Sequence, residues 1–374
     1  MRIGLDGQPL IKPKTGVGHY TFELACALAA LRPDVSFELI APDSFPPDIV
    51  RETEAIPNLH TVAVKTNRLT RRWWSIGLPR YMRSEKFDLF HGFNYEVPLL
   101  NSARNVVTVH DLSAFTHRHT HDPLIARRAR KRLPIMLRVA KRIITPTQVI
   151  KNEVATRFQI DPRRITVTPE APRTNFFHMK FDDTLSVRQR YRIEPDFILF
   201  VGTIEPRKNL QTLLRAFADI LSQTAHRPQL VIAGAEGWLT DDIHRFVTAL
   251  DFRDRLRMIG YLADEDLRAL YSSCRLFVYP SLYEGFGLPP LEAMACGAPV
   301  IAGRIPAHEE VLRDNARLID PLDEAALANA IVELLENDSA CEQLASRGRA
   351  HAANFSWQKT AELTWNVYEQ VLRV

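Results

Sequence analysis

Short apolar runs alternate with amphipathic segments along most of the chain. In the first half, the runs predicted to be strands span 2–6, 36–40, 59–64, 89–91, 105–109, 142–145 and 165–168. Apolar residues recur with helical spacing in the segments between them, which are 19–31, 73–84, 124–140 and 148–158. Strands that alternate with amphipathic helices favour βαβ units and a mostly parallel sheet.

A second series of the same kind follows residue 196. Its predicted strands span 197–201, 229–233, 256–259, 276–279 and 299–302, and its predicted helices span 209–222, 241–249, 264–273, 289–295 and 307–312. The prolines and charges between the two series are typical of a linker. The fold class is therefore expected to be α/β, with two Rossmann-like, doubly wound domains.

A length of 374 residues is more than one hydrophobic core usually serves, which also favours two domains. We expect a first domain over 1–175, a linker over 176–195 and a second domain over 196–354. The tail, 355–374, is predicted to be a helix that returns to the first domain. Its apolar stripe requires burial and includes Trp357, Trp365 and Tyr368.

Composition places the protein among folded proteins, with 46% hydrophobic and 25% charged residues. The four cysteines lack the spacing of a disulfide framework or a metal site, so we expect reduced thiols. No apolar run reaches the roughly 18 to 20 residues of a membrane-spanning helix, and the chain opens on a strand pattern instead of a signal peptide. A cytoplasmic protein is expected.

Basic residues are concentrated between residues 118 and 142, although the formal net charge is only +4. The cations from Arg127 onward are Arg127, Arg128, Arg130, Lys131, Arg132, Arg138, Lys141 and Arg142. No nucleic-acid motif accompanies them, so an anionic membrane surface or a phosphorylated acceptor is favoured over DNA or RNA. A solvated helix face is the alternative.

The segment 279–295 carries the strongest chemical signal. A strand runs into Ser281 and a glycine loop, and Leu288 then leads into two prolines that suit the first turn of a helix. Backbone amides of Gly285, Phe286 and Gly287 are available to an anion at the helix N-terminus. This arrangement predicts phosphate binding.

Two carboxylates belong to the same segment, Glu284 in the loop and Glu292 in the helix. A carboxylate repels phosphate but accepts hydrogen bonds from vicinal hydroxyls, so a sugar or ribose is the expected partner. A helix cap with a surface acid is the alternative.

A second motif, 200–210, also joins a strand to a glycine and a helix start. Gly202 and Thr203 follow the strand, and the adjacent cations Arg207 and Lys208 suit the oxygens of a diphosphate leaving group. The alternative is a solvated Arg–Lys pair.

The first domain offers two further candidates. Gly16 and Gly18 lie between the first strand and the first helix, where glycine lets the backbone approach a ligand, although a plain tight turn gives the same pattern. His110 and Asp111 follow a buried strand at the ligand side of an open α/β sheet, although a lone histidine is often structural. His91 and Asn94, after the preceding strand, are expected to line the same cleft.

The run from Glu284 to Glu292 resembles the E-x7-E signature of retaining glycosyltransferases of family GT4, which have the GT-B fold, and the resemblance extends over nearly the whole chain. It implies that Glu292 binds the donor ribose, that Glu284 contacts the transferred sugar, and that Arg207 and Lys208 bind the diphosphate. It also implies that His110 contacts the donor sugar near the anomeric centre, with Asp111 on the acceptor side. Many relatives have an arginine where this chain has Thr203.

The segments around Thr203 and His110 resemble those of bacterial mannosyltransferases of polysaccharide and lipopolysaccharide O-antigen biosynthesis. This implies a GDP-mannose donor, a glycan or polyprenyl-diphosphate-linked acceptor, and neither a cofactor nor a metal. The alternatives are a UDP-sugar donor, a nucleotide-sugar epimerase, a glycan phosphorylase and a non-catalytic nucleotide-sugar or lipid-binding protein. A dehydrogenase is disfavoured because no G-x-G-x-x-G fingerprint follows the first strand.

Overall fold

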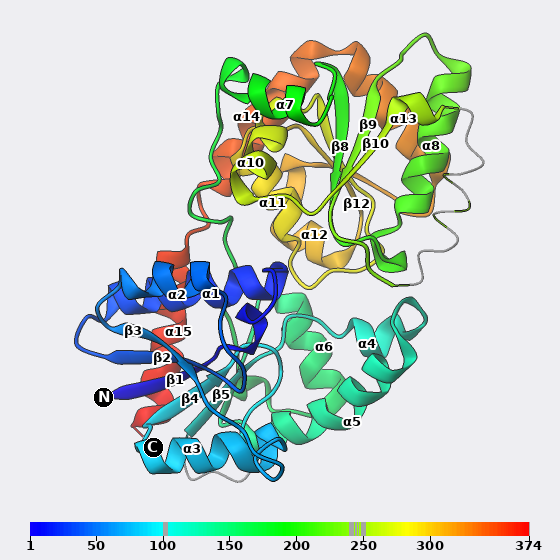
Figure 1. The fold of residues 1–374 in the computed structure, drawn as a ribbon. Helices are drawn as coiled ribbons and strands as arrows, with labels where there is room; N and C mark the ends of the chain where they lie inside the picture. The colour runs from blue at the N-terminus through cyan, green and yellow to red at the C-terminus, as the bar shows by residue number, and fades with distance from the viewer. Residues whose placement is uncertain (100–103, 239–242, 244, 246, 248–251, 374) are drawn as a thin grey trace. The chain divides into compact units, whose positions relative to one another are not determined.

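The computed structural model divides the chain into two compact units (Figure 1). It describes residues 1–99, 104–238, 243, 245, 247 and 252–373. Unit 1 consists of 1–112, 127–174 and 356–374, and unit 2 consists of 113–126 and 175–355. The chain therefore passes between the units after residues 112, 126, 174 and 355.

Unit 1 is built on a parallel sheet in the order β3-β2-β1-β4-β5-β6-β7. Its strands are β1 (Arg2–Asp6), β2 (Ser36–Ala41), β3 (Leu59–Ala63), β4 (Leu89–Gly92), β5 (Arg104–Thr108), β6 (Arg142–Thr145) and β7 (Ile165–Val167). The central strands are apolar and almost wholly buried, because helices cover both faces of the sheet.

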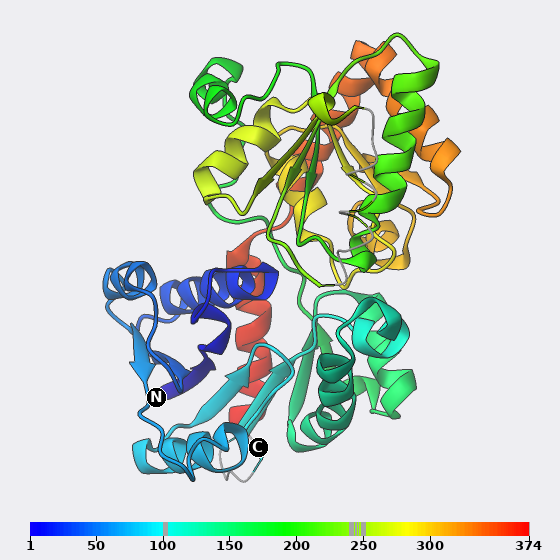
Figure 2. The same cartoon turned by 45° about the vertical axis from the view of Figure 1, so that its right-hand side comes forward.

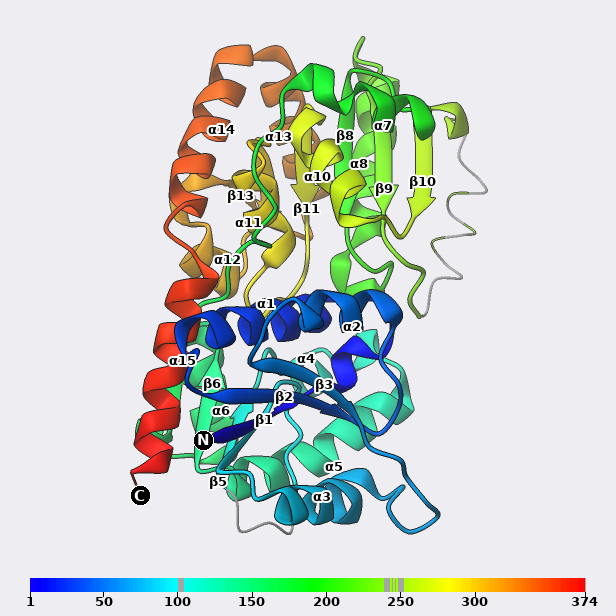
Figure 3. The same ribbon diagram turned by 60° about the vertical axis from the view of Figure 1, so that its left-hand side comes forward.

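The helices of unit 1 form two layers around this sheet. They are α1 (Gly16–Leu31), α2 (Pro47–Glu54), α3 (Leu78–Glu85, after a π-helical turn Trp73–Gly77), α5 (Pro123–Val139, which enters the unit at residue 127), α6 (Gln148–Phe158) and α15 (Trp357–Leu372). Helices α1 and α2 lie on one face of the sheet, and α3 and α5 lie on the other (Figures 1 and 3).

Helix α15 is an integral part of unit 1 and runs beside its sheet (Figure 2). It packs against α1, and the Trp357 indole donates a hydrogen bond of 2.9 Å to the Pro172 carbonyl. Trp357, Ala361, Trp365 and Tyr368 are buried along one face. The stripe of the tail is therefore covered by this unit.

Unit 2 is built on a six-stranded parallel sheet in the order β10-β9-β8-β11-β12-β13. Its strands are β8 (Phe197–Val201), β9 (Gln229–Ala233), β10 (Leu256–Gly260), β11 (Leu276–Tyr279), β12 (Val300–Gly303) and β13 (Arg317–Ile319). Its helices are α4 (Ser113–Thr116), α7 (Leu185–Arg190), α8 (Leu210–Gln223), α10 (Asp264–Ser273), α11 (Leu288–Ala295), α12 (Pro306–Val311), α13 (Glu324–Glu336) and α14 (Asp338–Ala352).

Short 3₁₀ turns complete the two units. They span Gln8–Leu10, Arg118–Thr120, Pro162–Arg164, Phe181–Thr184, Pro206–Lys208, Arg253–Arg255 and Arg313–Asn315. The turn at Pro206–Lys208 matters most here, because it holds the two cations predicted to bind a diphosphate.

Three sequence expectations differ from the structure. The expected linker 176–195 belongs to unit 2, where Phe176, Val187 and Ile193 are part of the core. Residues 113–126, expected in the first domain, also belong to unit 2. Strand β13 and helices α2, α13 and α14 were not expected, and the helix expected over 241–249 lies largely outside the described residues.

Each sheet has a point where the strand order reverses. In unit 2 the reversal falls between β8 and β11, and in unit 1 it falls between β1 and β4. Loops at the carboxyl ends of such neighbouring strands diverge and leave room for a ligand. The loops after β8 and β11 are those that carry the two strongest motifs.

Candidate functional site

The two motifs of unit 2 meet because β8 and β11 are paired in parallel. The Leu282 amide donates a hydrogen bond of 2.9 Å to the Arg207 carbonyl. The side-chain amide of Asn209, a residue with φ 57°, donates to the Pro280 carbonyl at 3.1 Å. The turn that carries the cations is therefore fixed to the loop that carries Glu284.

Arg207, Lys208 and Glu284 form a buried ion cluster. Lys208 Nζ lies 2.7 Å from Glu284 Oε1, and Arg207 Nη1 lies 3.0 Å from Glu284 Oε2. Arg207 Nη2 also pairs with Glu205 Oε1 at 2.5 Å. Two cations face two carboxylates, so the cluster is balanced in charge, and Glu205 is a member that the sequence analysis missed.

Glu284 accepts several hydrogen bonds within the protein. Besides the two cations, the Tyr279 hydroxyl and the Ser281 hydroxyl donate to Glu284 Oε1, at 2.9 and 2.7 Å. The carboxylate therefore accepts from four donors, three on Oε1 and one, Arg207, on Oε2. Burial alone would raise the pKa of Glu284, but the charges of Arg207 and Lys208 hold it well below its usual range.

The remaining donor-site candidates of unit 2 lie in the loops after β8 and β11 and in α11. Gly202 and Thr203 directly follow β8, and the Gly202 amide donates to the Ala233 carbonyl at 3.0 Å. Gly285, Phe286 and Gly287 lead into α11, which begins at Leu288. Glu292 lies inside α11 with 2% of its surface exposed. The structure thus brings the predicted residues of unit 2 to the β8 and β11 loops and to α11, which follows the β11 loop.

His308, at the start of α12, is a neighbour of this loop that the sequence analysis missed. Its Nδ1 donates to the Gly303 carbonyl at 2.8 Å, which leaves Nε2 as an acceptor. Nε2 is buried without a hydrogen-bond partner in the part of the chain that the structure describes. Burial lowers the pKa of His308, so the ring is neutral.

Glycine is required at position 287 by the backbone conformation and by the limited space around it. Its φ is 97°, a left-handed conformation, and a Cβ atom at this position would lie 3.0 Å from His308 Nε2 and Cδ2. We expect Gly287→Ala to destabilise the protein by about 1–3 kcal/mol through the backbone term, with a further cost from the contact.

Gly260→Ala is the matched control in a urea-unfolding comparison. Gly260 also has positive φ, 72°, but its Cβ would meet open space, so only the backbone cost applies. Equal losses in the two variants would show that the His308 contact does not matter.

In unit 1, His110 follows β5 and makes two hydrogen bonds within the protein. Nδ1 lies 2.8 Å from Glu170 Oε1, and Nε2 lies 2.8 Å from the Phe93 carbonyl oxygen. Burial alone would lower the pKa of His110. The hydrogen bonds to Glu170 and Phe93 and the charge of Glu170 outweigh this effect, so the pKa of His110 is raised. Glu170, which lies 60 residues after His110 in the chain, is another site residue that the sequence analysis did not predict.

Other expectations for unit 1 need correction. His91 does not line a cleft: it is fully buried, with Nδ1 bonded to the Tyr368 hydroxyl at 2.7 Å and Nε2 bonded to the Thr108 hydroxyl at 2.8 Å. Burial lowers the pKa of His91 to about 3. Gly16 and Gly18 lie in the first turn of α1 and not in the preceding loop. Asp111 lies beside His110 and favours its charged form.

Neither a metal site nor a membrane-spanning helix is found among the residues that the structure describes. No group of three or more His, Cys, Asp and Glu side chains is arranged there to hold a metal ion. Those residues also include no helix with the length and apolar character needed to cross a bilayer.

Two family models match the chain. Residues 14–171 match the model described as Glycosyltransferase Family 4, and residues 183–351 match the model described as Glycosyl transferases group 1. O-antigen chain mannosyltransferase B of Escherichia coli is 33% identical over 386 residues, covering 99% of this chain and 100% of that protein. O-antigen chain mannosyltransferase RfbU of Salmonella typhimurium is 24% identical, covering 83% of each chain.

Solved structures share the fold over the whole length. A crystal structure of Anabaena Alr3699/HepE in complex with UDP and glucose matches with a TM-score of 0.78 at 19% identity, covering 98% of this chain and 99% of that one. The lipopolysaccharide glycosyltransferase WaaG matches with a TM-score of 0.76 at 15% identity, covering 98% and 99%.

Proposed function

The chain belongs to the family 4 glycosyltransferases and has their GT-B fold, and from this premise we propose that it transfers mannose from GDP-mannose to a glycan, with retention of configuration. The observation that supports a nucleotide-sugar donor is the buried Arg207–Glu284–Lys208 cluster at the strand-order reversal of unit 2. The full-length similarity to an O-antigen mannosyltransferase supports mannose as the transferred sugar. The acceptor would be a glycan or a polyprenyl-diphosphate-linked glycan of a cell-surface polysaccharide.

The hydrogen bonds of Glu284 to both cations support an exchange mechanism. When the diphosphate of the donor arrives, its oxygens can take the third N–H of Lys208 and then compete with Glu284 for the N–H groups of Lys208 and Arg207 that Glu284 holds. Each N–H that turns to phosphate frees a lone pair on Glu284, which then accepts a hydrogen bond from a sugar hydroxyl. Diphosphate binding and sugar binding are thereby coupled.

The same cations would drive the chemical step. The bond between the anomeric carbon and the phosphate oxygen breaks, the acceptor oxygen bonds to that carbon on the same face, and the acceptor proton passes to the departing phosphate. Arg207 and Lys208 offset the charge that develops on the leaving group, so no metal is needed in this proposal. One well-placed donor of this kind contributes roughly 3–4 kcal/mol.

A thermal-shift panel of GDP, UDP, ADP and their sugars tests the donor. GDP and GDP-mannose should raise the melting temperature, because a ligand at 100 times its Kd stabilises the folded protein by about 2.7 kcal/mol. Stabilisation by UDP and UDP-sugars alone would replace mannose transfer by the UDP-sugar alternative, for which the UDP and glucose in the Anabaena structure are a precedent.

A radiolabelled donor distinguishes glycosyl transfer from epimerisation and from simple binding. Label that moves to an acceptor indicates transfer, label that appears in an altered nucleotide sugar indicates epimerisation, and label that stays in unchanged donor indicates a binding protein.

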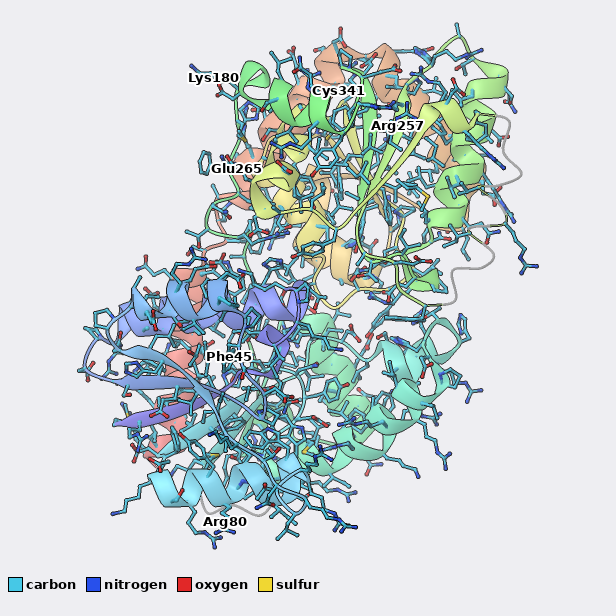
Figure 4. The ribbon with its side chains drawn as sticks, viewed as in Figure 1. Phe45, Arg80, Lys180, Arg257, Glu265 and Cys341 are labelled. Carbon is cyan, nitrogen blue, oxygen red and sulfur yellow. The ribbon has the colours of Figure 1, made fainter. Side chains whose placement is uncertain are left out.

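We also propose that α5 and the following residues place the protein on the cytoplasmic face of an anionic membrane. Within residues 127–141, one face of the helix is buried, and the exposed positions carry a single apolar side chain, Ile135, among cations. The exposed cations are Arg127, Arg128, Arg130, Lys131, Arg138 and Lys141. Helix α3 lies on the same face of the sheet, and Arg80 points outward from it (Figure 4). Such a face suits anionic headgroups.

Vesicle sedimentation tests this surface. The protein should sediment with phosphatidylglycerol vesicles at low salt, remain free with phosphatidylcholine vesicles, and dissociate as salt screens the charges. The triple variant R127Q/R130Q/K131Q should lose most of this binding, whereas R51Q/R253Q/R347Q, which changes three other exposed arginines, should keep it. Equal binding by both variants would rule out the α5 surface.

A further inference from the structure

The hydrogen bonds of His110 define its protonation state. The Phe93 carbonyl can only accept, so Nε2 carries a proton. An ionised Glu170 also can only accept, so Nδ1 carries a proton as well. The side chain of Glu170 is 5% exposed and that of His110 is 16% exposed, so solvent competes little for either bond.

The charged and titratable groups around His110 agree with a positive ring. Asp111 adds attraction to that of Glu170, and both raise the pKa of His110. His91 is neutral, and the Tyr20 ring meets His110 edge-on at 4.5 Å between centroids. Burial opposes the charge but is outweighed.

We propose that Glu170 is a positioning residue that keeps His110 doubly protonated through the neutral pH range, so that His110 carries a fixed positive charge in unit 1. This inference rests on the proposed function only where turnover is used as its readout. Both N–H groups are bonded within the protein, to Glu170 and Phe93, so the ring offers its surroundings a charge and ring carbons but no free N–H group.

A fixed imidazolium also excludes one chemical role. A ring with both nitrogens protonated has no lone pair to accept the proton of an acceptor hydroxyl. His110 is therefore not the general base, and the acceptor proton must go to another group, which fits a route through the departing phosphate oxygen.

Nitrogen-15 NMR of the full chain with labelled histidine tests the protonation state directly. The His110 signals are assigned as those lost in His110→Gln, and both ring nitrogens should be protonated at pH 7 in the wild type. In Glu170→Gln the carboxylate charge is gone, so the titration midpoint of His110 should fall by about 1–3 pH units. Glu170→Asp should restore part of the shift, and Glu54→Gln, an exposed carboxylate on α2, should leave the midpoint unchanged.

The pH dependence of turnover provides the functional readout. The wild-type rate should vary little between pH 6 and 8, whereas Glu170→Gln should lose activity as the pH rises through the lowered midpoint. A neutral ring in the wild type, with the proton on Glu170, would overturn the inference, as would equal midpoints in the wild type and Glu170→Gln. If the wild type transfers no sugar but the NMR result holds, the proposed function fails and the protonation inference stands.

Discussion

Replacing Lys208 with alanine is expected to lower the turnover number of glycosyl transfer by roughly 10²–10³-fold, the effect of removing one donor that stabilises a developing negative charge. Lys208 Nζ donates to the Tyr279 hydroxyl at 2.6 Å and to Glu284 at 2.7 Å, which leaves one of its three donors for a phosphate oxygen. Glu284 keeps Arg207, Tyr279 and Ser281 in the variant. The loss of stability should therefore be smaller than the 3–5 kcal/mol typical of a broken buried ion pair.

Steady-state kinetics and urea unfolding on the same preparation separate the two effects. Arg215→Ala on α8 is the matched control, because Arg215 is half exposed and pairs with Glu324 on the surface. This control should leave rate and stability near those of the wild type. An unchanged turnover number in Lys208→Ala would refute the diphosphate role of Lys208.

Glu284→Gln is expected to abolish measurable transfer and to destabilise the protein by about 3–5 kcal/mol. The glutamine amide would have to turn its NH₂ group toward Arg207 or toward Lys208, Tyr279 and Ser281, all of which are donors. Either orientation leaves a buried cation without its counter-charge. Glu309→Gln, which removes an exposed partner of Arg304, should cost little.

The contribution of Glu284 to stability has a defined pH dependence. Its folded pKa lies below the ordinary value of 4.5, so its contribution is fully present above pH 4.5 and is lost as the pH falls toward the folded value. The stability difference between wild type and Glu284→Gln should therefore be constant from pH 7 to about 5 and should shrink below that. A difference that grows on acidification would contradict the ion cluster.

Most strands were predictable because each is a contiguous apolar run flanked by turn residues. Strands β1, β6, β8, β9 and β11 have the predicted bounds. Strand β13 has three residues, and only Ile319 is buried, so its apolar pattern is too short to be recognised in the sequence. Residues 176–195 are rich in charged side chains, which hide the spacing of Phe176, Val187 and Ile193 that the finished core reveals.

The chemistry of the site was predictable residue by residue, but its pairings were not. Arg207, Lys208 and Glu284 each follow a strand, so their place at a sheet edge can be read from local patterns. That Lys208 bonds Glu284 depends on β8 lying next to β11, a strand order that no local pattern encodes. The same holds for His110 and Glu170, and for His91, whose partner Tyr368 is 277 residues away.

Helix α15, a helix of sixteen residues, affects the order in which the two units can fold. Unit 1 opens the chain but needs α15 for the hydroxyl that bonds His91 and for the indole that bonds Pro172. Domains usually fold in turn as they leave the ribosome, from the N-terminus onward. Here all of unit 2 is made before α15, so unit 1 lacks both of these bonds until residues 357–372 have left the ribosome.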